Sequence, residues 1–235
     1  SIVLLYDNFR SIVRAIAEGR QLFTNLQLSF QYLLMIHIPL VLTAAVIPLA
    51  GYPLLYLPVH VVWLEIIIHP TALLVFQDLP GDGQLAPVTR NRRLRFFSLP
   101  QWFTIAAVGI AVTAIVTFSY LRSLGAGLDV EHARAMALVV LTVASAGITA
   151  NLSRLRTRGA WLMVGGTLAL SVLFVQTPLL AAFLHLKPLH GDDWLLAIAG
   201  GLIASLLSAI TSVRGRSASR QETRRDNKRL PVGHG

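Results

Sequence analysis

The chain contains no cysteine and few charged residues. With no cysteine among 235 residues, disulfide bonds, thiolate metal sites and cysteine nucleophiles are excluded. Charged residues make up 13% of the chain and hydrophobic residues 54%, and the mean hydropathy is +0.64. Because globular domains usually carry about 25% charged residues, the composition excludes an ordinary soluble domain and predicts a membrane protein.

Several functional motifs are also missing from the sequence. It has no glycine-rich phosphate-binding loop and no acidic cluster for Mg²⁺. We therefore expect that this chain alone does not hydrolyse ATP. The sequence opens on Ser1 without methionine or a signal-peptide pattern, so we expect it to begin inside a larger protein.

Six apolar stretches have about the 20 residues that a helix needs to cross a bilayer. The sequence therefore predicts an all-α polytopic membrane protein, a bundle of six transmembrane helices. Apolar residues at helical spacing precede the first stretch at Ile12, Ile16 and Phe23, which predicts that its helix extends as a stalk over about 15–31. The six stretches are 28–49, 57–76, 102–121, 133–152, 160–180 and 194–213.

The basic residues indicate how the predicted bundle is oriented. An even number of spans places both termini on one side, and all but three of the 20 basic residues then share that side. Since positive loops remain in the cytoplasm, we expect cytoplasmic termini and a plasma (inner) membrane location. Basic residues are densest at 90–95 and at 214–235. The second segment has the composition of a disordered tail that is drawn to anionic lipid.

Glu65 and His69 are the most informative residues. Glu65 is the only one of the 11 acidic residues deep inside a membrane-length stretch, and His69 follows four residues later. Ionisable groups are costly in lipid and usually face a cavity or an ion pathway. Pro70, and Pro39 in the preceding stretch, remove backbone donors and free carbonyl groups. We therefore expect helix irregularity at both prolines and an ion site at Glu65.

Four segments stand in the order found in a known family. They are 1–13 (SIVLLYDNFRSIV), 57–63 (LPVHVVW), 133–137 (ARAMA) and 193–196 (DWLL). They resemble the entries to the fifth, sixth, eighth and tenth membrane helices of P-type cation-transporting ATPases, in the calcium- and sodium-pump-like branch.

This resemblance implies the carboxyl-terminal membrane portion of such a pump, helices five to ten. Residues 1–27 would be the end of the phosphorylation domain and the stalk, and 28–213 the six-helix transmembrane domain. ATP and Mg²⁺ would bind upstream domains, which transmit phosphorylation through the stalk to the ion site, and this chain would hold neither. The expected partners are the transported cation or proton, the lipid bilayer and the rest of the pump, with no nucleic acid.

The positions that correspond to the family's ion ligands differ from the calcium-pump pattern. Calcium takes six to eight oxygen ligands, whereas this chain offers imidazoles and apolar groups at several of these positions. The resemblance thus implies a cation site at Glu65, His69 and His37, but not a calcium site of the usual kind. The corresponding positions are His37, Leu40, Glu65, Ile68, His69 and Ser145.

Two chemistries fit Glu65, His69 and His37. Imidazole nitrogen and one carboxylate suit zinc, manganese or a similar divalent metal. Alternatively, the side chains take up and release protons, because burial disfavours the charged form of each group. The identity of the metal, if any, stays open at this point.

Other readings give these residues no role in transport. A Glu65–His69 hydrogen bond would fix helix packing, and His37 would satisfy a carbonyl freed by Pro39. The chain would then be a non-catalytic membrane subunit or an inert fragment. An intramembrane metalloenzyme is a further alternative, but it needs about three protein ligands and an open position for water.

Two further groups of residues carry structural predictions. Tyr52, Tyr56, Trp102 and Trp194 lie near predicted membrane edges, where aromatic residues anchor helices at the interface. The glycine pairs at 165–166 and 200–201 are expected to let helices approach closely.

Overall fold

The part of the chain that the structure describes is entirely helical. This computed structural model describes residues 9–77, 79–80 and 96–229, and side chains within 12–77, 79–80 and 96–211. Six helices in the described ranges are long and apolar enough to cross a membrane, which confirms the predicted fold class. The seven helices described are α1 (Phe9–Leu49), α2 (Pro58–Phe76), α3 (Leu99–Gly125), α4 (Val130–Ser153), α5 (Arg158–Gln176), α6 (Pro178–Phe183) and α7 (Gly191–Arg229).

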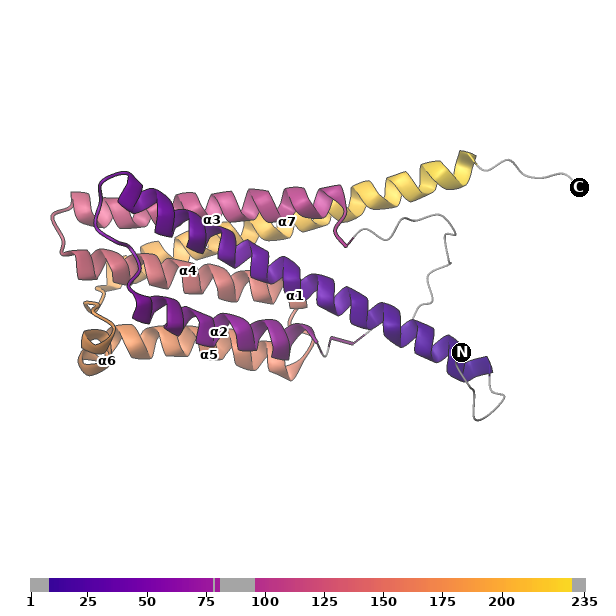
Figure 1. Cartoon of the computed structure of the whole chain (residues 1–235), viewed down its shortest axis with the longest axis horizontal. Helices are drawn as coiled ribbons and strands as arrows, with labels where there is room; N and C mark the ends of the chain where they lie inside the picture. Colours follow the sequence, from indigo (N-terminus) through magenta and orange to yellow (C-terminus); the bar gives the residue numbers. More distant parts are fainter. Residues whose placement is uncertain (1–8, 78, 81–95, 230–235) are drawn as a thin grey trace, which may run out of the picture.

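The first helix extends well beyond the bundle, as the stalk prediction requires. α1 is a single helix of 41 residues, and Figure 1 shows its amino-terminal half projecting past α2, α3, α4 and α5, at the end where α7 also projects. Polar side chains of α1 attach it to the end of α2. The Asn25 Nδ2 group donates to the Gln77 carbonyl at 2.8 Å, and the Ser29 hydroxyl donates to the Ala72 carbonyl at 3.0 Å.

The helix α4 forms the centre of the bundle and packs closely against α7. Nearly all its side chains are buried, and it contacts α1, α2, α3, α5 and α7. A Cβ atom added at Gly201 of α7 would lie 2.3 Å from Val143 Cγ1. The close approach predicted for 200–201 is therefore confirmed. The same prediction was wrong for 165–166, where an added Cβ would meet nothing within 4 Å.

The fifth predicted span is interrupted near its end. We expected one helix over 160–180, but α5 ends at Gln176 and a short helix, α6, starts at Pro178. Proline has no N–H to donate and favours an extended residue before it. Thr177 accordingly has φ −84° and ψ 115°, so the break follows from Pro178.

The last helix is longer than the sequence suggested. We expected a disordered tail from Arg214, whereas α7 continues as helix to Arg229. Extending an existing helix costs far less than nucleating a new one, and the sequence after Arg214 contains helix formers such as arginine, glutamine and glutamate.

The connections between helices lie at two opposite ends of the bundle. Figure 1 places the described start of α1, the α4–α5 turn and the carboxyl-terminal part of α7 towards one end. The α1–α2 connection, the α3–α4 turn and α6 lie at the other end. Arg154 and Arg156 belong to the α4–α5 turn. The basic cluster at 90–95, the first eight residues and 230–235 lie outside the described residues.

Three of the four predicted interfacial aromatics have surface exposure. Tyr52 is 45% exposed and Trp102 is 50% exposed, and Trp194 is partly buried. Tyr56 differs, because it is buried and its hydroxyl accepts a hydrogen bond from the Thr43 hydroxyl at 3.2 Å. Burial raises the pKa of Tyr56. The prediction for Tyr56 was wrong because the α1–α2 connection folds back over α1.

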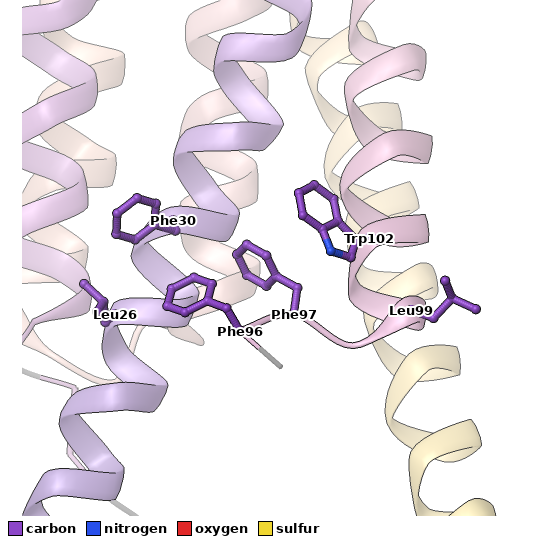
Figure 2. A pocket seen from close by; sticks show the side chains of 6 residues that line it. All are labelled: Leu26, Phe30, Phe96, Phe97, Leu99 and Trp102. Atoms are coloured by element: carbon purple, nitrogen blue, oxygen red, sulfur yellow. The ribbon is translucent and has the colours of Figure 1, made fainter. Parts of the chain in front are cut away.

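An apolar pocket lies between α1 and the start of α3. Figure 2 shows its aromatic side chains, which reach from α1 across to α3. The rings of Phe30 and Phe96 are 5.5 Å apart and those of Phe97 and Trp102 are 5.3 Å apart. None of its described lining residues is titratable, so these side chains offer no cation ligand. Its lining residues are Leu26, Phe30, Phe96, Phe97, Leu99 and Trp102.

Candidate functional site

The three residues proposed from the sequence lie together at the contact between α1 and α2. Glu65 and His69 stand one turn apart on α2, and His37 faces them from α1. The Oε1 atom of Glu65 is 3.3 Å from His37 Nε2, and its Oε2 atom is 2.6 Å from His69 Nδ1. One carboxylate thus lies between two imidazoles, whose ring centres are 6.1 Å apart.

Neither contact of the Glu65 carboxylate is a well-formed hydrogen bond. The Oε2 atom is buried and has no hydrogen-bond partner among the described residues, although His69 Nδ1 lies only 2.6 Å away. The two observations are compatible because a hydrogen bond depends on angle as well as distance. A buried carboxylate oxygen without a donor costs free energy, so this oxygen is suited to receive a proton or a cation.

The His37 ring is oriented by the backbone of its own helix. Its Nδ1 atom lies 2.8 Å from the Leu33 carbonyl. A carbonyl only accepts, so Nδ1–H is the donor. When the ring is neutral, Nε2 therefore carries the lone pair that points towards Glu65. The carbonyl freed by Pro39 is that of Met35, four residues before it, so His37 does not satisfy that group as the structural alternative proposed.

The group is partly open to the surroundings of the bundle. The side chains of His37, Glu65 and His69 are 33%, 30% and 59% exposed. By contrast, Leu40 and Ile68, which occupy ligand positions in the family pattern, are buried in the apolar core. Titratable side chains on an open face can bind a cation only if further ligands or water complete its coordination.

Both prolines of the predicted site lie inside helices that continue past them. Pro39 is within α1 and Pro70 is within α2. Neither helix ends at its proline. The expected irregularity therefore consists of backbone hydrogen bonds that the prolines cannot make. Because proline has no N–H, the carbonyls of Met35 and Ile66 lose their helical donors. These carbonyls belong to the same two helices as the carboxylate and imidazoles.

Ser145 does not join the group. This α4 residue is buried, and its hydroxyl lies 2.8 Å from the Tyr32 hydroxyl of α1. No sequence signal identifies Tyr32 as the partner of Ser145, because a tyrosine in an apolar run looks like any other core residue. The bond instead links α1 to the central helix α4.

Comparison with known proteins agrees with this architecture. Residues 53–213 match the family described as "Cation transporting ATPase, C-terminus". A calcium-transporting ATPase of Bacillus subtilis (strain 168) is 24% identical over 221 residues, which cover 89% of this chain and 25% of that protein. An endoplasmic reticulum-type calcium-transporting ATPase 2 of Arabidopsis thaliana is 25% identical over 130 residues, 51% of this chain and 12% of that protein.

A calcium-transporting ATPase 1 of Bacillus cereus is 35% identical over 66 residues, 28% of this chain and 7% of that protein. The chain therefore spans about a quarter of the Bacillus subtilis relative and smaller shares of the others. Because the family match covers more than half of its length and five of the six candidate spans, this chain belongs to the P-type cation-transporting ATPases, as their carboxyl-terminal transmembrane portion.

Proposed function

We propose that this chain forms part of the cation pathway of an ATP-driven pump and that Glu65 is the main charge-bearing ligand. The observation that carries the proposal is the position of the Glu65 carboxylate between His37 and His69, with its buried Oε2 atom lacking a hydrogen bond. A purely structural carboxylate would be expected to accept aligned hydrogen bonds. This one has nearby nitrogen atoms and unfilled acceptor capacity.

The cation is one that accepts nitrogen and oxygen ligands. The relatives are named for calcium transport, but calcium takes six to eight oxygens, and this group offers two imidazoles and one carboxylate. A borderline divalent metal such as Zn²⁺ or Mn²⁺ suits the 3.3 Å pair of Glu65 and His37, since ligands of one tetrahedral zinc lie about 3.3 Å apart.

A proton is the second candidate. The 2.6 Å between Glu65 Oε2 and His69 Nδ1 is shorter than the spacing of two ligands on one metal and lies just below the about 2.7–2.9 Å of charge-assisted N–H···O hydrogen bonds. A proton therefore fits between these two atoms better than a metal ion does. The two candidates are separated by testing activity against metal concentration and against pH.

The stalk would couple this site to ATP hydrolysis elsewhere in the pump. ATP and Mg²⁺ would bind the upstream domains, whose phosphorylation would move α1. His37 and the Ser29 link to α2 both lie on α1. A displacement of α1 along α2 would therefore change the His37–Glu65 distance and the access of a cation to the carboxylate. The cytoplasmic position of both termini belongs to this proposal.

The test is the replacement Glu65→Gln in the intact pump. Glutamine keeps the size and polarity of the side chain but removes its charge, so ATP hydrolysis stimulated by the transported cation should be lost while the protein still folds. Asp129→Asn is the matched control, since Asp129 is exposed, lies outside the membrane spans and the stalk, and pairs with Lys187. Unchanged cation-stimulated hydrolysis in Glu65→Gln would refute the role proposed for Glu65.

A further inference from the structure

A second cluster of metal-binding side chain types lies at the end of the bundle where α3 turns into α4 and α7 begins. His132 is in the first turn of α4, Asp193 is in the first turn of α7, and His190 immediately precedes α7. The Asp193 Oδ2 atom lies 2.9 Å from His132 Nε2 and 3.5 Å from His190 Nδ1. One ligand atom from each residue lies within 4.8 Å of the other two.

The spacing of these atoms suits a small divalent metal. In a tetrahedral zinc site with bonds of about 2.0–2.2 Å, neighbouring ligand atoms are about 3.3 Å apart. The two measured separations, 2.9 and 3.5 Å, lie on either side of that value. Two imidazoles and a carboxylate favour Zn²⁺ and related metals over Ca²⁺ and Mg²⁺, which prefer oxygen ligands.

The two least exposed members are held in place by further hydrogen bonds. His132 is buried, and its Nδ1 atom lies 2.9 Å from the buried hydroxyl of Ser123 on α3. An Nδ1–H donated to that hydroxyl leaves the Nε2 lone pair directed at Asp193. This resembles the outer-shell support of metal-binding histidines. The His190 backbone N–H donates to Asp193 Oδ2 at 3.0 Å and so fixes the carboxylate at the start of α7.

His190, the third member, is exposed, so a metal ion and a water ligand can approach the cluster from its side. The His190 side chain is 84% exposed, whereas that of His132 is 6% exposed. A metal approaching from the surroundings would meet His190 first and then the pre-positioned pair. Sites with three protein ligands keep their fourth position for water.

We propose that His132, His190 and Asp193 bind one divalent metal ion of the zinc class, which ties the start of α4 to the start of α7. This site is separate from Glu65, which lies within α2, and it does not depend on the function proposed there. The bound metal would stabilise the contact between the two helices that pack most closely in the bundle. Its role is structural or regulatory, at the end of the bundle opposite the α4–α5 turn.

The competing explanation is an ordinary ion pair. A protonated His132 would then donate from Nε2 to Asp193 without any metal, and His190 would add only an exposed contact with Asp193 at 3.5 Å, which is worth little. The two explanations differ at His190. This exposed residue contributes to metal binding in the first case and to nothing measurable in the second.

The experiment measures Zn²⁺ binding and thermal unfolding of the full chain in detergent, with Zn²⁺ as the only added metal. We expect one Zn²⁺ bound per chain at this cluster and a rise in the unfolding midpoint on saturation. His190→Ala should weaken binding by more than about 100-fold, beyond the 10- to 100-fold effect of outer-shell changes. It should leave the metal-free midpoint unchanged. Ser123→Ala should weaken binding by about 10- to 100-fold.

Two controls locate the binding. His185→Asn removes an imidazole from the loop between α6 and α7 and keeps a residue that tolerates its φ of 52°, so it should bind Zn²⁺ normally. A His37→Ala/His69→Ala double variant should also retain this Zn²⁺, which separates the cluster from the Glu65 site. Absence of Zn²⁺ binding, or binding and stabilisation that survive in both His190→Ala and Asp193→Asn, would overturn the proposal and establish the ion pair.

Discussion

The Nδ1 atom of His69 lies 2.6 Å from the Oε2 atom of Glu65, one helical turn earlier, yet no hydrogen bond joins them. The helix brings the two groups together, since residues four apart share a face. A proton or cation that arrives between them gains interactions with both at little conformational cost. The proposed role of α2 in the cation pathway depends on this pair of side chains.

Replacing His69 should change how the pump selects its cation. His69→Ala removes the nitrogen beside Oε2 but leaves His37 on the other oxygen. For a metal substrate, we expect the concentration for half-maximal ATP hydrolysis to rise at least about tenfold, equal to about 1.4 kcal/mol. For a proton, the pH profile of the intact pump should shift instead. Identical metal and pH profiles in the variant and the parent would exclude His69 from the site.

The link between Tyr32 and Ser145 should stabilise the packing of α1 on α4. Both side chains are buried and their hydroxyl oxygens are 2.8 Å apart. Hydrogen bonds between membrane helices contribute about 0.6 kcal/mol on average and up to about 1.7 kcal/mol. Unfolding free energies of Tyr32→Phe, Ser145→Ala and the double variant form a mutant cycle. We expect a coupling energy within that range. A coupling energy of zero would mean that the two hydroxyls act independently.

The close contact of α7 with α4 should not tolerate a methyl group at Gly201. A Cβ there would lie 2.3 Å from Val143 Cγ1 and 3.1 Å from the Ala144 backbone nitrogen. Because backbone cannot move aside easily, Gly201→Ala should lower the unfolding free energy by about 1–3 kcal/mol. Gly165→Ala is the control, since it meets open space. It should be neutral or stabilise by up to about 1 kcal/mol. Equal effects at both positions would contradict the packing described.

The Asp129–Lys187 ion pair, outside the membrane spans, should give a small acid-dependent stabilisation. Lys187 donates to the Asp129 carboxylate and lowers its pKa, while the carboxylate raises the pKa of Lys187. A lowered carboxyl pKa contributes stability that is present above the unfolded value of about 4 and is lost as the pH falls through the folded value.

Thermal midpoints of the parent and Lys187→Met measure this contribution. The parent should unfold at a slightly higher temperature at pH 7, and the difference should shrink as the pH falls below the unfolded carboxyl pKa of about 4. The effect is small because the side chains of Asp129 and Lys187 are 65% and 49% exposed. A difference that persists unchanged in acid would show that Lys187 stabilises the fold in some other way.

Much of the fold follows from the sequence because the bilayer restricts the choices. Apolar length, the stalk pattern before residue 28 and the family resemblance predicted the six spans and the long α1. Pro178 in principle predicts the helix break at Thr177. A prediction based on the length of the apolar stretch misses it, because the residues on both sides are apolar. The segment up to Arg229 is helical because it continues the helix that precedes it. Its amino-acid composition alone does not contain that information.

The candidate site was less accessible from sequence than the fold. Spacing alone put Glu65 and His69 on one face, whereas the approach of His37 depends on the register of α1 against α2, which came only through the resemblance. The His132–Asp193 contact joins residues 61 positions apart, so no local pattern predicts it. The burial of Tyr56 was not predicted for a similar reason, since its hydrogen-bond partner Thr43 lies on the other side of the α1–α2 connection.

The most direct test of the central claim is cation movement by the intact pump in sealed vesicles supplied with ATP. Uptake would be measured for Zn²⁺, Mn²⁺, Ca²⁺ and protons with the parent, Glu65→Gln and the control Asp129→Asn. We expect that the parent and Asp129→Asn move at least one of these cations and that Glu65→Gln moves none. Transport by Glu65→Gln at the parent rate, or no ATP-driven movement of any of them by the parent, would contradict it.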